Sequence, residues 1–167
     1  MWRTRASPGG EVSLPAGISA TEHQARAIHS LSGAGNVYLF GPPGSGKTTL
    51  LDAVHAANPG SVRKHFGAFY RELHAALPGV GRSVPRAVAE LTERARLVCF
   101  DELHLHDVAD SLYLAAALDH WEDAEVRVVA TSNYRPAELL PNPLLHDAAL
   151  PVIRRIRRPW RGNERSG

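Results

Sequence analysis

Eight consecutive residues of this chain have the types and spacing needed to hold a phosphate group. The run Gly41-Pro42-Pro43-Gly44-Ser45-Gly46-Lys47-Thr48 fits the phosphate-binding (Walker A) pattern of a glycine, four residues and then Gly-Lys-Thr. Its glycines let backbone N–H groups turn inward around a phosphate, its lysine reaches the β and γ oxygens, and its threonine hydroxyl serves Mg²⁺. We predict that this loop, together with Thr49, binds a nucleotide.

Two carboxylates suit a second part of the same site. Asp101 and Glu102 directly follow the apolar run 97–100, and in phosphate-loop enzymes an acid at the end of a hydrophobic strand (Walker B) holds Mg²⁺. A second carboxylate beside it can orient or deprotonate the water that attacks the γ-phosphate. We therefore expect Thr48 and Asp101 to serve the metal and Glu102 to act as the base. The plainer alternative is an acid in a strand-end turn.

Asn133 is a third candidate, and it follows the strand expected at 125–130 through Thr131 and Ser132. One strand after the carboxylate pair, its amide is placed to position the attacking water, so we take Lys47, Glu102 and Asn133 as the catalytic residues. An asparagine that only shapes the turn before Pro136 is the alternative.

Histidines near these strand ends have less specific interpretations. His65 and Phe66 end an expected strand and either line a substrate or γ-phosphate surface or belong to the core. His104 and His106 invite a zinc hypothesis, but no matching Cys/His pair stands at ligand spacing elsewhere. We favour ordinary loop histidines for this second pair.

The segments between the motifs alternate between strand and helix patterns. Strands are expected at 37–40, 61–66, 97–100 and 125–130, and helices at 19–32, 48–57, 67–77, 85–95 and 107–121. Such alternation is typical of an α/β fold with a parallel sheet between helices, as in the P-loop NTPases. A strand–loop–helix order around residues 41–48 also aims a positive helix N-terminus at the bound anion.

Composition places the chain among globular proteins of one domain. It has 167 residues, of which 44% are hydrophobic and 22% charged. We expect a flexible leader at 1–18, a nucleotide-binding core at 19–153 and an arginine-rich tail at 154–167. The single cysteine, Cys99, suits a reducing compartment, and the first ten residues lack a signal-like apolar stretch, so the cytoplasm is expected.

The tail concentrates positive charge, because six arginines fall between Arg154 and Arg165. Such a segment can contact nucleic acid, a membrane surface or an acidic partner. A solvated chain end is the more ordinary interpretation, and the net charge of +2 does not by itself indicate a nucleic-acid partner.

Several of these segments together resemble the ZapE-type AAA+ ATPases, a family of bacterial cell-division and mitochondrial quality-control proteins. The similar stretches are 36–41 before the loop, 64–74 with its His-Phe pair, 97–110 around the carboxylates, 129–133 at the third candidate, and Leu-Pro-Val-Ile at 150–153. The resemblance implies an AAA+ core that binds and hydrolyses ATP with Mg²⁺. It also implies a protein partner to be remodelled or regulated, and a homo-oligomer.

The chain departs from the family pattern in two respects. Family members are longer and continue into a last strand and a C-terminal helical portion. They also carry an arginine before the Leu-Pro pair, a candidate finger for a neighbour's nucleotide, where this chain has His146. A finger of this kind is worth about 10³–10⁵ in rate. Arg135 or the cluster at 154–158 are the candidates to replace it.

Two other functional classes remain open. One is a nucleotide-binding interaction module that binds ATP and hydrolyses little; the absent finger favours it and the presence of Glu102 opposes it. The other is a phosphoryl transferase of the nucleotide-kinase type, which shares the loop, although Asp-Glu-Leu-His at 101–104 matches it less well than an ATPase.

Overall fold

Four parallel strands form the sheet at the centre of the protein. The computed structural model describes residues 12, 22–33, 35–140 and 142–157. The strands are β1 (Val37–Phe40), β2 (Val62–His65), β3 (Leu97–Asp101) and β4 (Arg127–Ser132), and they lie in the order β1-β4-β3-β2. The predicted α/β parallel sheet is confirmed. Except for Val12, the expected leader lies outside the described residues, as do residues 158–167 of the expected tail.

The strand register brings all four carboxyl ends to one edge of the sheet. Phe40 pairs with Ser132 and His65 with Asp101, while β3 and β4 are joined through Phe100 and Ala130. Ligands of open parallel sheets bind outside this edge. The residues that directly follow each of the four strands therefore lie at this edge, on the side where a ligand would bind.

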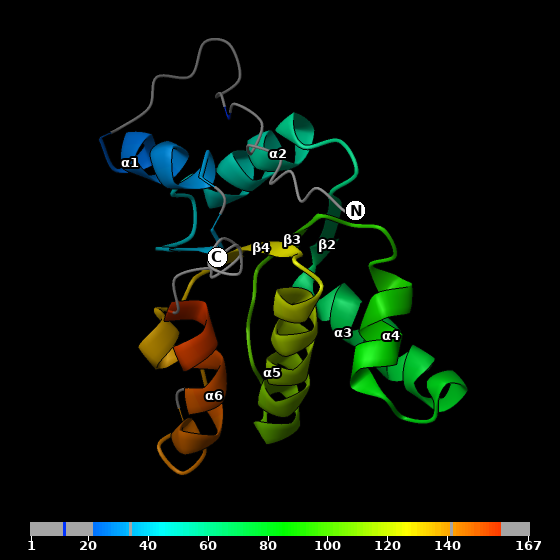
Figure 1. Ribbon diagram of the computed structural model, residues 1–167. Coiled ribbons are helices and arrows are strands. Elements are labelled where there is room, and N and C mark those ends of the chain that lie inside the picture. The colour runs from blue at the N-terminus through cyan, green and yellow to red at the C-terminus, as the bar shows by residue number, and fades with distance from the viewer. Residues whose placement is uncertain (1–11, 13–21, 34, 141, 158–167) are drawn as a thin grey trace, which may run out of the picture.

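Helices cover both faces of the sheet (Figure 1). Their bounds are α1 (Glu22–Leu31), α2 (Lys47–Ala57), α3 (Phe66–Ala76), α4 (Val84–Leu91), α5 (Val108–Asp123) and α6 (His146–Arg157), with short 3₁₀ turns η1 (Leu77–Val80) and η2 (Pro136–Glu138). Helices α1 and α2 pack on one face, and α3, α4, α5 and α6 on the other. Val12 is buried in the layer of α1 and α2.

The position of strand β3 in the sheet explains why its sequence is apolar without interruption. Leu97 and Cys99 pack toward α1 and α2, whereas Val98 and Phe100 pack into the opposite layer, as the period of two in a strand requires. Every residue of the strand is buried, which is the pattern of a central parallel strand. Burial raises the pKa of the Cys99 thiol to about 12, so this cysteine is a protonated core residue at neutral pH.

Aromatic side chains fill the larger layer. Phe69 of α3, Phe100 of β3 and Trp121 of α5 lie with ring centroids 4.9 to 5.7 Å apart, distances typical of favourable aromatic pairs. The Trp121 indole N–H donates to the Thr92 hydroxyl at 3.1 Å, so the one polar atom of this ring is paired although it is buried. This cluster anchors α3 and α5, the helices that begin beside the functional edge.

The bounds of β4 and α4 differ most from the sequence prediction. Strand β4 runs from Arg127 to Ser132 instead of 125–130, because Glu125 adopts a left-handed φ of 57° and the Val126 N–H still closes the end of α5 on the Trp121 carbonyl. Helix α4 ends at Leu91 instead of about residue 95. The next residue, Thr92, turns back, and its hydroxyl donates to the Val88 carbonyl at 2.7 Å.

Helix α6 is not among the helices predicted from the sequence. It crosses the boundary expected between the core and the tail at residues 153 and 154. It contains Pro151, a residue that normally interrupts a helix, but Val152 and Ile153 are buried in the core. Arg155 binds Asp119 of α5 through two hydrogen bonds of 2.5 and 2.6 Å. Tertiary contacts of this kind offset the poor local propensity. No helix among the described residues has the length and apolarity to cross a membrane.

Candidate nucleotide site

The loop between β1 and α2 has the backbone shape needed to surround an anion. Gly44 and Gly46 take left-handed φ values of 76° and 84°, which L side chains rarely adopt. Gly46 is the N-cap of α2, and since it has no side chain, the first N–H groups of the helix face outward without a capping oxygen. Unpaired N–H groups at a helix N-terminus form an anion site. Residues 41–48 and Thr49 are thus placed as predicted, at the end of β1.

Lys47 is folded back over its own loop. Its ammonium donates to the carbonyls of Gly41 and Pro42, both at 2.8 Å, and to the Ser45 hydroxyl at 3.2 Å. These acceptors hold the ammonium over the concave side of the loop. All three are neutral groups, so none of these contacts balances the positive charge of the lysine.

Asp101 ends β3 directly beside the loop helix. Its Oδ1 accepts from the Thr131 hydroxyl at 2.7 Å and from the Thr48 hydroxyl at 3.3 Å, and its Oδ2 accepts from Arg63 at 3.1 Å. A carboxylate and a hydroxyl are hard oxygen donors of the type that Mg²⁺ prefers beside nucleotide phosphates. The donor set therefore fits Mg²⁺, which Thr48 and Asp101 would hold and which would neutralise charge on the phosphates.

Glu102, the predicted base, leaves the strand in an unusual conformation. Its φ is 55°, in a region that costs a non-glycine residue about 1–3 kcal/mol and that is enriched at functional sites. Strand β4 holds this conformation in place. The Thr131 hydroxyl accepts from the Glu102 N–H at 3.1 Å, and the Thr131 carbonyl accepts from the Leu103 N–H at 2.7 Å. The carboxylate consequently points away from the sheet toward solvent, where an attacking water would lie.

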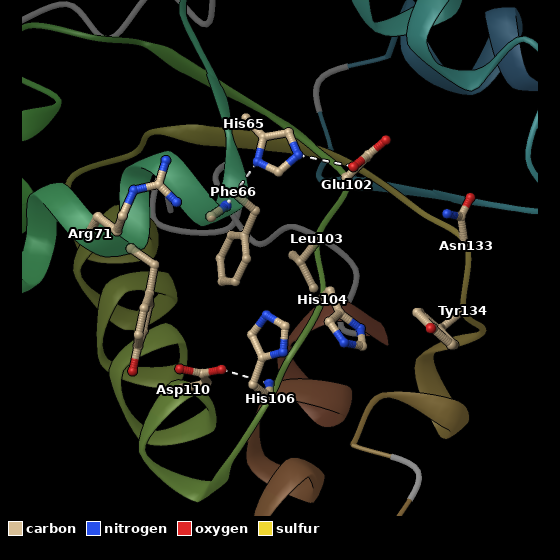
Figure 2. A pocket seen from close by; sticks show the side chains of 12 residues that line it. His65, Phe66, Arg71, Glu102, Leu103, His104, His106, Asp110, Asn133 and Tyr134 are labelled. Carbon is tan, nitrogen blue, oxygen red and sulfur yellow. Dashed lines mark hydrogen bonds and ion pairs between the residues drawn. The ribbon is translucent and has the colours of Figure 1, made fainter.

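His65, at the end of β2, contacts Glu102 across the edge of the sheet (Figure 2). Its Nδ1 accepts from the Gly67 N–H at 3.2 Å and so caps α3. The ring proton of the neutral imidazole therefore sits on Nε2, which donates to the Glu102 carboxylate at 2.9 Å. The His65 side chain is about half exposed, whereas Phe66 is buried, so of this pair only Phe66 is a core residue.

A pocket of about 440 Å³ opens beside this pair. Glu102 and Asn133 line it at the ends of β3 and β4, and residues of α3 and α5 line it as well (Figure 2). Because β4 lies between β1 and β3, Asn133 stands between the phosphate loop and the carboxylates. This is the position predicted for a residue that holds the attacking water.

His104 and His106 line the other end of the pocket. Their rings lie 4.5 Å apart edge to face, and His104 stacks on Tyr134 at 4.9 Å. Within the part of the chain that the structure describes, no group of three or more His, Cys, Asp or Glu side chains is arranged to hold a metal ion. These contacts give the histidines a packing role at the wall of the pocket.

The environment of His104 predicts a pH effect on stability. Burial, reinforced by His106 and opposed by Asp110, lowers the pKa of His104 below its ordinary value. The unfolded chain then binds a proton more readily than the native protein, so stability falls as pH drops through the ordinary histidine range near about 6.5. We expect the free energy of unfolding of His104→Gln, measured by urea denaturation, to fall less between pH 7.5 and 5.5 than that of the wild type.

The matched control for this measurement is His29→Gln, which removes an exposed histidine of α1. It should leave the pH dependence of unfolding as in the wild type. Equal slopes for His104→Gln and the wild type would show that protonation of His104 does not destabilise the native protein.

His146 and the arginines considered as replacements for the finger differ in their surroundings. His146 begins α6 and is partly buried. Arg155 is held by Asp119, as described above, whereas Arg135 and Arg154 are exposed. Of the described arginines proposed as substitutes, Arg135 and Arg154 are therefore the ones with side chains accessible to a neighbour.

Sequence reasoning missed two members of the site. From the sequence, Thr131 is only part of the segment leading to Asn133, yet its hydroxyl joins Asp101 and Glu102. Arg63 is not singled out by any motif, yet it binds Asp101 from β2. The available signal for Arg63 is a pair of basic residues, Arg63 and Lys64, inside a short strand, where charged side chains require partners.

Comparison with known proteins identifies relatives of this chain. Lactation elevated protein 1 homolog B of Danio rerio is 32% identical over 132 residues, which is 70% of this chain and 26% of that protein. Cell division protein ZapE of Escherichia coli K12 is 32% identical over 126 residues, which is 72% of this chain and 34% of that protein. The matched part thus spans about a quarter to a third of these relatives.

Among solved structures, AMPPCP-bound DnaA of Aquifex aeolicus matches with a TM-score of 0.58 and 15% identity, over 73% of this chain and 42% of that one. At this identity the likeness shows the fold, a P-loop NTPase of the AAA+ type. The sequence profile described as AFG1-like ATPase matches residues 17–160, most of the sequence, and the chain therefore belongs to the AFG1-like ATPase family.

Proposed function

We propose that this chain binds ATP with Mg²⁺ and hydrolyses it. The observation that carries the proposal is the alignment of four strand ends at one edge, which gathers the loop after β1, Asn133 after β4, Asp101 and Glu102 at β3, and His65 at β2. Membership of an ATPase family supports it, as does the ATP analogue AMPPCP bound to the structurally similar DnaA.

In this proposal each residue has one task. Residues 41–48 surround the phosphates and Lys47 contacts the β and γ oxygens. Thr48 and Asp101 hold Mg²⁺, which supplies charge stabilisation on the phosphates. Glu102 accepts the proton of the attacking water, and Asn133 orients that water. His65 donates to Glu102 and thereby determines where its carboxylate points before the nucleotide arrives.

We further propose that hydrolysis serves to remodel or regulate a protein partner in the cytoplasm, with cell division as the setting. The support is the similarity to the Escherichia coli relative, a cell division protein, and the lone buried cysteine. A homo-oligomer is part of the proposal, because an arginine finger from a neighbour would complete the site. Contact of the arginine-rich segment with nucleic acid or a membrane stays a prediction; for nucleic acid alone, a DnaA of similar fold has been solved with single-stranded DNA.

A second candidate is a nucleotide-binding module that hydrolyses little. Two observations favour it: His146 stands where the family resemblance leads us to expect the arginine, and His65 already occupies the carboxylate of Glu102. The two candidates differ in turnover, not in binding, so binding and phosphate release must be measured separately.

The test is phosphate release from ATP over a series of protein concentrations in the presence of Mg²⁺. We expect release above that of Lys47→Ala, and a specific rate that rises with concentration because a neighbour supplies the finger. Release equal to that of Lys47→Ala at every concentration would overturn hydrolysis. If ATP still bound under those conditions, the binding module would be the correct function.

A further inference from the structure

Arg63 joins the helix of the phosphate loop to the carboxylate of the metal site. It lies on β2, and its Nε forms an ion pair of 2.7 Å with Asp52 Oδ1 on α2. Its Nη2 binds Asp101 Oδ2 at 3.1 Å. The Asp101 side chain is only 13% exposed and that of Arg63 27%, whereas that of Asp52 is 56% exposed. The inner ion pair is therefore the better shielded from solvent.

The two oxygens of Asp101 have different partners. Oδ1 accepts from the hydroxyls of Thr131 and Thr48, while the contact from Arg63 is to Oδ2. A partial rotation of the carboxylate about its Cβ–Cγ bond would break the contacts of both oxygens. Arg63 thus holds Oδ1 on the side of Thr48, where the metal would be bound.

We propose that Arg63 is a positioning residue that fixes the carboxylate of Asp101 for Mg²⁺, an inference that rests on the proposed function. The planar guanidinium is suited to this task because it presents several donors in a rigid fork. Its Nη2 binds Asp101 on β3, and its Nε lies in ion-pair contact with Asp52 on the loop helix. Lysine, with one ammonium on a flexible stem, would not hold both carboxylates in the same geometry.

Arg63 could either orient Asp101 or only counter its charge. The two roles predict opposite changes in metal binding when Arg63 is removed, so an experiment can separate them. If Arg63 acts by orienting Asp101, its removal weakens metal binding, as loss of an outer-shell partner usually does by about 10- to 100-fold. If Arg63 acts only as a counter-charge, its removal leaves Asp101 more negative and strengthens metal binding. The sign of the change separates the two roles.

The experiment measures the affinity for ATP by calorimetry, once in EDTA and once over a series of Mg²⁺ concentrations. For Arg63→Met we expect unchanged affinity in EDTA and at least about a tenfold higher Mg²⁺ concentration for half-maximal effect. Arg63→Lys should resemble Arg63→Met, because it keeps the charge and loses the fork. Asp52→Asn, which removes only the outer anchor, should fall between Arg63→Met and the wild type.

Several results would overturn the inference. They are an unchanged or lower Mg²⁺ requirement in Arg63→Met, wild-type behaviour in Arg63→Lys, and an equal loss of affinity in EDTA and in Mg²⁺, which would indicate a general structural role. If Arg63→Met did not fold by its melting curve, Arg63→Lys and Asp52→Asn would decide. A wild type that bound no ATP in either buffer would refute the proposed function, and this inference with it.

Discussion

Replacing Glu102 by glutamine should reduce ATP turnover by about 10²–10⁴, the usual contribution of a positioned general base, while ATP binding remains at the wild-type level. The substitution keeps the shape of the side chain and an oxygen that can accept from His65 Nε2, which lies 2.9 Å from the carboxylate. The left-handed backbone at this position, with φ of 55°, is retained because Thr131 holds it through the Glu102 N–H. What is lost is the ability to take a proton from water.

The measurement is single-turnover phosphate release beside equilibrium ATP binding. The matched control is Glu125→Gln, because Glu125 is also an exposed glutamate with a left-handed φ of 57°, but it precedes β4 at the opposite end of the sheet. We expect this control to turn over ATP like the wild type. Wild-type turnover in Glu102→Gln would mean that another group activates the water.

Replacing Lys47 by alanine should weaken ATP binding by about 10- to 100-fold, since a hydrogen bond to a charged group contributes about 1.5–3 kcal/mol. The ammonium is held over the loop by the carbonyls of Gly41 and Pro42, so it is already positioned for a phosphate. Turnover should fall as well, because the same charge acts on the γ-phosphate. Lys47→Ala should therefore lose both ATP binding and turnover, whereas Glu102→Gln should lose turnover alone.

The chain offers a precise control for this variant, because Lys64 is its only other lysine. Lys64 pairs with Glu72 of α3, away from the loop. Calorimetric titration with ATP should give wild-type affinity for Lys64→Ala and a large loss for Lys47→Ala. Equal affinities for the two variants would contradict the assignment of residues 41–48 as the phosphate site.

The elements that carry the loop and the acids could be predicted because their signals are local. A continuous apolar run predicts β3, and strand–loop–helix chemistry around Gly44 and Gly46 predicts the turn between β1 and α2. Helix α6 was not predicted, and the bounds predicted for β4 were wrong, because local signals are misleading in both places. Pro151 argues against a helix that packing stabilises, and Thr131 and Ser132 look like the end of a strand although both are buried in it.

From residue types and spacing alone we could predict which side chains can do chemistry and that the ends of parallel strands would gather them. Residue type and spacing suffice for this, because the phosphate loop and the buried strand are set by contacts between neighbours in the chain. The contacts of Arg63 and Thr131 with Asp101, and of His65 with Glu102, became visible only in three dimensions. These pairs join strands separated by whole helices, and they depend on strand order and register, which no local pattern encodes.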